Sequence, residues 1–255
     1  MPQLSAVLIV KNEAAILAAC LARLDWVDEI VVLDGGSVDD TVNIARQYTD
    51  KVYVESEWQG YGVQRQRAQS HASGDWILMV DADEHVSVEL KISIQTVTEA
   101  DDRSKAYSIP ILPWCFGRFI HHGGWYPARK VRLYPRDKAC YGDQRVHEKL
   151  AFEAGMEVEQ LQGDLLHYTY RDLEHYLVKS AMYATEWAEQ RQQRGKRSSL
   201  FQGIIHGTGC FLRMYVFRAG FLDGQQGLLL ALLSAHSTFV KYADLWIRHQ
   251  PESDQ

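Results

Sequence analysis

The nine residues from Trp76 to Glu84 are WILMVDADE, five apolar side chains followed by three acids around one alanine. A short, uninterrupted apolar run is typical of a strand buried on both faces of a parallel sheet. Asp81 and Asp83 follow at the point where this strand should end. Two carboxylates one residue apart can point into one crevice and bind a hard divalent cation such as Mg²⁺ or Mn²⁺. An acidic turn before a helix has the same composition, so the motif alone leaves both interpretations open.

The sequence on either side of this motif alternates between strand and helix patterns. We expect strands at 4–10, 29–33 and 51–54 and helices at 13–24, 39–48 and 62–72. After the motif, Ser87 is placed to cap a helix that runs to about Ala100. This alternation predicts an α/β fold with a doubly wound, mostly parallel sheet, which binds ligands at the carboxyl ends of its strands.

Polar residues also follow the second predicted strand. Asp34 comes first and is a candidate acceptor for a ribose or a base, and the next two residues, Gly35 and Gly36, let a ligand approach the backbone. Asp40 lies three residues after Ser37, which is the spacing of a capping box, so we expect it to serve the next helix.

The pattern changes from about residue 106. Strands are expected at 106–111 and 130–134, separated by an aromatic, glycine-rich and basic loop, and a short strand-and-loop region follows up to His167. A helix is expected at 172–192, and residues 203–248 predict two helices joined at 220–224. The chain therefore combines an α/β body with a C-terminal helical extension.

Charge is distributed unevenly along the 255 residues, whose net charge is −6. Residues 191–248 contain eight Lys or Arg and two acids, whereas the rest of the chain contains 19 basic and 31 acidic residues. The acidic body argues against a general nucleic-acid-binding protein. The basic, aromatic-rich extension, with Phe211, Tyr215 and Phe217 between Arg213 and Arg218, is typical of amphipathic helices at an anionic membrane surface. A helical hairpin packed on protein gives a similar pattern, and this alternative stays open.

The sequence shows no targeting signal. The N-terminal apolar run is too short for a signal peptide, and no run of apolar residues reaches the length of a membrane-spanning helix. The four cysteines are widely spaced and match no zinc or redox motif. We therefore expect a cytoplasmic protein.

Several motifs, taken in order, resemble one enzyme family. The chain resembles the donor half of the inverting family-2 glycosyltransferases in four motifs, Val10-Lys11-Asn12-Glu13, Asp34-Gly35-Gly36-Ser37, Gly74-Asp75-Trp76 and Asp81-Ala82-Asp83-Glu84. Within this family, the chain resembles the lipopolysaccharide-core glucosyltransferases of Gram-negative bacteria over most of residues 4–246. The motifs that carry this closer resemblance are Trp58-x-Gly60-Tyr61-Gly62, Arg65-Gln66, Gly124-Trp125-Tyr126-Pro127, Lys130-Val131-Arg132-Leu133-Tyr134, Val146-His147-Glu148 and Gly220-Phe221-Leu222-Asp223-Gly224.

This resemblance implies a GT-A nucleotide-diphospho-sugar transferase fold. Residues 1–104 would form the nucleotide-sugar-binding half, residues 105–170 the acceptor-binding and catalytic half, and residues 171–255 a helical, membrane-associating region. The implied donor-binding residues are Lys11, Glu13, Asp34, Gly36, Arg65 and Asp81. The implied metal ligands are Asp83, Asp81 and His167, with Asp83 as the principal one.

Glu148 is the residue that the resemblance places as general base. An inverting transfer needs one carboxylate to take the proton of the acceptor hydroxyl while a metal ion neutralises the departing diphosphate. A surface Glu beside a His is the simpler interpretation of the same residues, and a partly buried structural histidine is the corresponding one for His167. Arg129, Lys130 and Arg132 are candidates to face an anionic acceptor, and alternation along a strand would put Lys130 and Arg132 on one face. A solvated strand edge is an equal alternative.

The resulting prediction is a metal-dependent hexosyltransferase that moves glucose from UDP-glucose to a heptose of the lipopolysaccharide inner core. It would work as a peripheral protein on the inner face of the inner membrane, with a lipid-linked glycan as acceptor. Two alternatives remain: a transferase for a capsule or O-antigen lipid, and a non-catalytic protein that binds nucleotide-sugar and docks on a membrane. A sugar-phosphate nucleotidyltransferase is disfavoured because Lys11-Asn12-Glu13 is not a glycine-rich phosphate loop.

Overall fold

The computed structural model describes residues 1–142 and 150–250. Within these residues the chain forms two compact units. Unit 1 comprises residues 1–111 and 128–167, and unit 2 comprises residues 112–127 and 168–255. Unit 1 therefore contains most of both expected halves of the α/β body, whereas the loop 112–127 belongs with the C-terminal helices.

Unit 1 is built on a mixed sheet with the strand order β3-β2-β1-β4-β8-β6-β12-β5, in which β11 also pairs with β6. Strands β1 (Leu4–Val10), β2 (Glu29–Asp34), β3 (Val52–Val54) and β4 (Trp76–Met79) run parallel. The second part of the sheet contains β5 (Glu84–Val86), β6 (Lys105–Cys115), β8 (Ala128–Pro135), β11 (Glu157–Gln160) and β12 (Leu165–Tyr170). A separate hairpin pairs β9 (Ala139–Tyr141) with β10 (Leu150–Phe152). The expected α/β architecture is confirmed.

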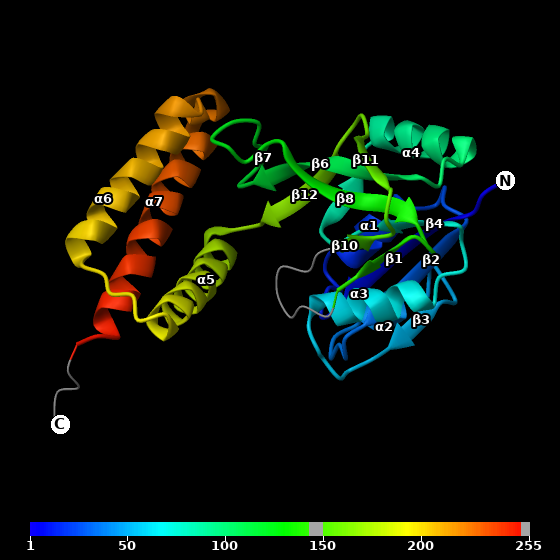
Figure 1. Cartoon of the computed structure of the whole chain (residues 1–255), viewed down its shortest axis with the longest axis horizontal. Coiled ribbons are helices and arrows are strands. Elements are labelled where there is room, and N and C mark those ends of the chain that lie inside the picture. The colour runs from blue at the N-terminus through cyan, green and yellow to red at the C-terminus, as the bar shows by residue number, and fades with distance from the viewer. Residues whose placement is uncertain (143–149, 251–255) are drawn as a thin grey trace. The chain divides into compact units, whose positions relative to one another are not determined.

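Helices cover both faces of this sheet (Figure 1). On one face, Leu8 and Leu78 pack with residues of α1 (Leu17–Leu21) and α4 (Val88–Ala100). On the other face, Val7 and Met79 pack with residues of α3 (Tyr61–Ser70). The alternate side chains of β1 and β4 thus enter two different cores, which explains why both strands are apolar without interruption.

Two helices of unit 1 are shorter than expected. Helix α1 begins only at Leu17, because Asn12 adopts a left-handed backbone with φ of 56° and turns precede the helix. Helix α2 spans only Thr41–Ala45. The capping box expected of Ser37 and Asp40 is wrong, because Asp40 makes no side-chain cap and instead accepts a hydrogen bond from Asn43 at 2.7 Å.

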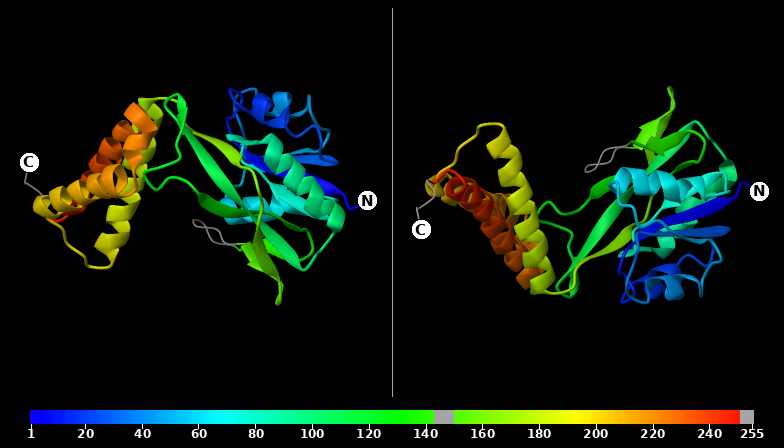
Figure 2. Two further views of the ribbon diagram at one scale, coloured as in Figure 1. Left: turned by 90° about the horizontal axis from the view of Figure 1, so that it is seen from above. Right: turned by 90° about the horizontal axis from the view of Figure 1, so that it is seen from below.

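Unit 2 consists mainly of helices. They are α5 (Leu173–Gln193), α6 (Leu200–Phe211), a π-helical turn η1 (Leu212–Phe217), a 3₁₀ turn η2 (Gly220–Asp223) and α7 (Gly224–Ile247). The short strand β7 (Arg118–Phe119) pairs with the end of β6. Helices α5, α6 and α7 lie side by side (Figure 2). Among the described residues, the structure contains no helix long and apolar enough to cross a membrane.

Small residues bring α6 and α7 together. A Cβ atom added to Gly203 would lie 3.1 Å from the Phe239 ring, and one added to Gly207 would lie 3.0 Å from the carbonyl oxygen of Ala235. Because α6 uses its glycine face against α7, its larger apolar side chains point elsewhere. The expected C-terminal pair of helices joined at residues 220–224 is confirmed.

Candidate functional site

The loops after β1 and β2 are tied together at the carboxyl edge of the sheet. The backbone N–H of Asn12 donates to Ser37 Oγ at 2.8 Å, and Asn12 Oδ1 accepts from the N–H of Val38 at 2.9 Å. The N–H of Glu13 donates to Thr41 Oγ1 at 2.8 Å. These bonds fix the segment that the sequence proposed for nucleotide binding, and they depend on the left-handed conformation of Asn12.

Asp34 shapes the second loop from inside. Its carboxylate is 1% exposed and accepts hydrogen bonds from the N–H groups of Gly36 and Ser37, both at 2.8 Å, and from the Ser37 hydroxyl. Gly36 has φ of +83°, and a Cβ there would lie 2.9 Å from Cβ of Ser56. Asp34 therefore holds the loop rather than facing a ligand directly, which differs from the role expected of its side chain.

A hollow of about 520 Å³ lies beside these loops. It is lined by Ile9, Val10, Lys11, Asn12, Glu13, Trp58 and Tyr61. The Trp58 and Tyr61 rings are half exposed and meet edge to face, with centroids 4.9 Å apart. Sequence reasoning placed Lys11 and Glu13 at this site but did not assign the two aromatic residues to it, although both belong to the Trp58-x-Gly60-Tyr61 motif. Their exposed faces can stack on a planar base or a sugar ring.

Two buried arginines bind the first aspartate of the acidic motif. Arg65 Nη2 donates to Asp81 Oδ1 at 2.7 Å, and Arg132 Nη2 donates to Asp81 Oδ2 at 2.5 Å. Burial alone would raise the pKa of Asp81, but the charges of Arg132 and Arg65 outweigh it and hold this pKa well below its usual range. Both oxygens of Asp81 are thus engaged by cations, and Arg65, at 4% exposed, acts on the site through Asp81.

Arg132 is not the acceptor-facing residue that strand alternation predicted. The pairing of β6 with β8 shifts register between Tyr107, opposite Leu133, and Ser108, opposite Val131. Arg132 is therefore the extra residue of a β-bulge, and bulges redirect side chains. Its side chain is 2% exposed and lies inward, whereas Lys130 on the same strand is exposed.

Glu84 completes this buried cluster. Its Oε1 accepts from Arg132 Nη2 at 2.7 Å, and its Oε2 accepts from the N–H of Asp81 at 3.0 Å. Burial raises the pKa of Glu84, and the attraction of Arg132 offsets this only in part. The thiol of Cys20, on α1, donates to the carbonyl oxygen of Glu84 at 3.3 Å. The turn 81–84 is thereby fixed by side chains from three other parts of unit 1, Arg65, Arg132 and Cys20.

The second aspartate of the motif faces a histidine. His167 Nε2 lies 3.1 Å from Asp83 Oδ2, and each side chain is 27% exposed. The antiparallel pairing of β5 with β12 places His167 opposite Glu84 and so beside Asp83. Burial would lower the pKa of His167, but the hydrogen bond to Asp83 and the negative charges of the turn raise it above its usual value.

Asp83 and His167 fit a divalent cation, since one carboxylate oxygen and one imidazole nitrogen point to the same exposed place. The described residues contain no group of three or more His, Cys, Asp or Glu side chains arranged for a metal ion. Asp81, the third expected ligand, is instead paired with Arg65 and Arg132. Asp83 and His167 are thus the two candidate ligands at this edge, and they lie within hydrogen-bond distance of each other.

Two further expectations concern residues elsewhere. Glu148, the expected base, lies outside the described residues, so its role stays a prediction. The sequence favours solvated loop residues at His121 and His122, and His121 is exposed whereas His122 is half-buried. Both backbone N–H groups donate to the buried carboxylate of Asp223, and His122 Nδ1 lies 3.1 Å from Asp223 Oδ1. Trp125 packs with the small core around Ile120 in unit 2.

The hollow, the acidic turn and the aspartate–histidine pair all lie at the carboxyl edge of the parallel strands, which is where α/β sheets of this kind bind ligands. The family model of glycosyl transferase family 2 matches residues 5–140, and the chain belongs to this family. The expected GT-A type of α/β fold is therefore confirmed together with the family.

Two relatives match the chain over nearly its full length. One is the lipopolysaccharide core biosynthesis glycosyltransferase LpsC of Rhizobium meliloti, 29% identical over 96% of this chain and 93% of that protein. The other is an uncharacterized glycosyltransferase of Rickettsia felis, 30% identical over 96% of this chain and 90% of that protein. Among solved structures, S. aureus TarS residues 1–349 in complex with UDP covers 98% of this chain and 93% of its own, with 14% identity and a TM-score of 0.48.

Proposed function

We propose that this family-2 glycosyltransferase moves glucose from UDP-glucose to a heptose of the lipopolysaccharide inner core, with inversion at the anomeric carbon. The observation that carries the proposal is the Asp83–His167 pair at 3.1 Å, at the same sheet edge as the hollow that Lys11 and Glu13 line. The carboxyl edge of parallel strands is where such sheets bind nucleotides.

The donor would occupy the hollow next to β1. The uracil ring stacks on the aromatic wall of Trp58 and Tyr61, and the loop that Asp34 and Gly36 shape lies against the ribose. Lys11 is exposed and supplies a positive charge for the diphosphate. Arg65 contributes through Asp81, because its guanidinium already binds that carboxylate.

Asp83 and His167 are the residues that would hold Mg²⁺ or Mn²⁺. Such an ion, when bound, neutralises the charge that develops on the departing diphosphate. His167 must release its proton to serve as a ligand. Asp81 keeps the turn in position, since its two oxygens are held by arginines.

Glu148 is the proposed base. In a single displacement, the acceptor hydroxyl oxygen attacks the anomeric carbon from the face opposite the diphosphate, its proton passes to the Glu148 carboxylate, and the bond to the diphosphate oxygen breaks. One carboxylate suffices because the leaving group needs no proton.

The acceptor is assigned from the relatives. The similarity to LpsC, over 93% of that protein, supports an acceptor of the lipopolysaccharide core. A lipid-linked acceptor places the reaction at the inner face of the inner membrane, and the basic, apolar unit 2 supports association with an anionic membrane surface. A capsule or O-antigen lipid is the second candidate acceptor, because the donor site described here is equally suited to it.

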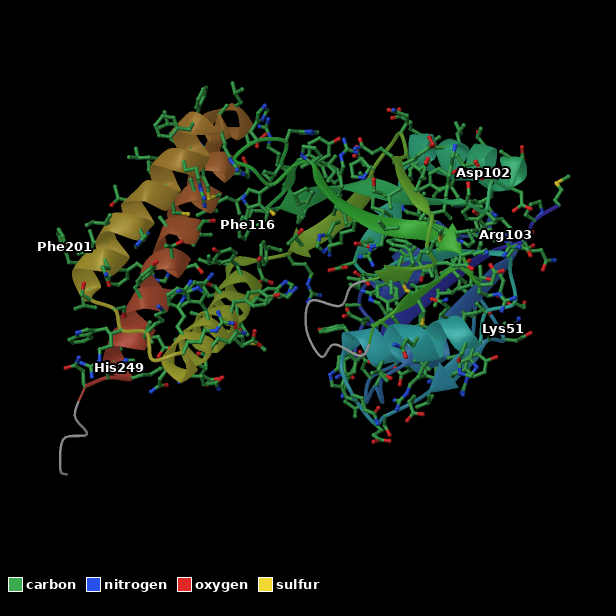
Figure 3. The ribbon with its side chains drawn as sticks, in the orientation of Figure 1. Lys51, Asp102, Arg103, Phe116, Phe201 and His249 are labelled. Carbon is green, nitrogen blue, oxygen red and sulfur yellow. The ribbon has the colours of Figure 1, made fainter. Side chains whose placement is uncertain are left out.

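The test is a transfer assay with radiolabelled UDP-sugars and purified cores that end at the inner heptose. The proposal predicts transfer from UDP-glucose alone, dependent on Mg²⁺ or Mn²⁺, and lost in Asp83→Asn and Glu148→Gln. Asp102→Asn is the matched control, a partly exposed acid just after α4 (Figure 3). Transfer only to an O-antigen or capsule lipid would overturn the acceptor assignment, and full activity of Glu148→Gln would overturn the base.

A further inference from the structure

The end of unit 2 formed by residues 212–224, which we call the hairpin tip, exposes large apolar side chains. Phe217 is 80% exposed, Leu222 54%, and Phe221 and Val216 each 50%. Exposing an apolar side chain of this size to water costs free energy. A contiguous group of such side chains therefore marks a surface that binds an apolar partner.

Cations surround these apolar side chains. Arg213 and Arg218 are exposed on the tip itself, and Arg118 of the neighbouring loop reaches it, with Nη2 3.4 Å from the carbonyl oxygen of Leu222. Residues 196–243 contain five Lys or Arg and one acid, Asp223. That acid is 1% exposed and is bound by His121 and His122, so this segment presents positive charge outward.

The tip is built as a fixed structure. The chain turns so tightly that a Cβ on Gly220 would lie 2.7 Å from the carbonyl oxygen of Met214, and one on Gly227 would lie 1.9 Å from that of Gly220. The N–H of Gly123 donates to the carbonyl oxygen of Arg218 at 2.9 Å. The backbone that presents the apolar side chains is therefore already ordered, so binding costs only the ordering of the side chains themselves.

We infer that the hairpin tip inserts Val216, Phe217, Phe221 and Leu222 into an anionic lipid bilayer, while Arg118, Arg213 and Arg218 pair with the phosphate headgroups. The positive charge of the tip favours an anionic bilayer over a second copy of the chain as its partner. A second copy of the tip would bring like charges face to face, which opposes association, whereas an anionic bilayer offers negative headgroups directly above an apolar layer. This inference rests on the proposed membrane-surface function and names the part of the chain that carries it.

The experiment is co-sedimentation of the full chain with vesicles of phosphatidylcholine alone or with about one third phosphatidylglycerol. The tip variant is Phe217→Ser with Phe221→Ser. The matched control is Phe201→Ser with Ile205→Ser, which removes similarly exposed side chains, 69% and 52%, near the other end of α6 (Figure 3). Arg213→Gln tests the charge separately.

The tip variant should lower the partition coefficient on anionic vesicles by about tenfold or more, and the control should lower it by less than about threefold. Arg213→Gln should weaken binding to anionic vesicles only. The inference is overturned if the control loses as much as the tip variant, if the unmodified chain binds neither vesicle or both equally, or if sedimentation velocity shows a dimer that the tip variant abolishes.

Metal-dependent UDP binding, measured on the same variants without vesicles, separates this inference from the proposed function. If the tip variant binds both UDP and vesicles as the unmodified chain does, only the assignment of the hairpin tip as the membrane-binding surface is overturned. If vesicle binding depends on the tip but the chain binds no UDP-sugar, the proposed donor site is overturned and the inference about the hairpin tip stands.

Discussion

Arg132 donates to Asp81 at 2.5 Å, from a bulge in the strand next to the one that ends at the acidic turn. The same guanidinium nitrogen donates to Glu84 at 2.7 Å. One buried cation thus holds both ends of the turn that carries Asp83. The first acid of the motif serves the geometry of the turn, and the second acid faces His167.

Arg132→Met should destabilise the protein by about 3–5 kcal/mol, because it leaves the buried Glu84 without its cation and Asp81 with Arg65 alone. Urea unfolding measures this free energy. Lys130→Met, an exposed change on the same strand, should stay within about 0.5 kcal/mol. An Arg132→Met protein as stable as the unmodified chain would show that the cluster is not structural.

His167→Gln should weaken UDP binding in the presence of Mn²⁺ by at least about tenfold and leave binding in chelator unchanged, because it removes one of the two proposed metal ligands. Calorimetric titration separates the two conditions. His85→Gln, at a neighbouring histidine of β5, is the control and should keep metal-dependent binding. Equal loss in Mn²⁺ and in chelator would mean that His167 supports the fold only.

Gly36→Ala should destabilise unit 1 more than Gly155→Ala does. Both glycines have positive φ, which costs an alanine about 1–2 kcal/mol. Only at Gly36 would the new Cβ meet another atom, Cβ of Ser56 at 2.9 Å, at a further cost of about 1–3 kcal/mol. Equal unfolding free energies for the two variants would contradict the tight packing of this loop.

Glu29 should make the protein sensitive to acid. Burial would raise the pKa of Glu29, but hydrogen bonds from Lys51, Ser5 and Ser73 lower it to about 2, and Lys51 lies on the surface of unit 1 (Figure 3). Because the folded pKa lies below the unfolded one, this stabilisation is present above about pH 4.5 and is lost as the pH falls toward 2. Glu29→Gln should lose less stability than the unmodified chain over that range in urea unfolding. Parallel pH profiles would refute the assignment.

The repeating elements could be predicted from the sequence because each strand of the parallel sheet is a continuous apolar run. The run Leu4–Val10 and the strand that begins at Trp76 are found as expected. Ser87 caps α4, where Ser87 Oγ accepts from the N–H of Leu90 at 3.2 Å. Apolar strands and helix caps depend on residues close together in the sequence, so they can be predicted from one segment at a time.

What the sequence did not reveal depends on pairing between distant segments. The bulge that turns Arg132 inward exists only in the register of β6 against β8, so strict alternation gave the wrong face. His167 reaches Asp83 through the pairing of β12 with β5, and β5 was not expected as a strand. Asp34 is a local case instead, because the N–H groups of Gly36 and Ser37, two and three residues later, fold back onto its carboxylate.

The proposed function requires that this chain bind a UDP-sugar at the edge that carries Asp83 and His167, and that binding depend on a divalent cation. Calorimetric titration of a UDP-sugar panel, with Mn²⁺ and with chelator, tests it most directly. We predict binding of UDP-glucose in Mn²⁺, loss of that binding in chelator and in Asp83→Ala, and retention in Glu148→Gln. Binding that is indifferent to both chelator and Asp83→Ala, or preference for another nucleotide-sugar, would contradict the account.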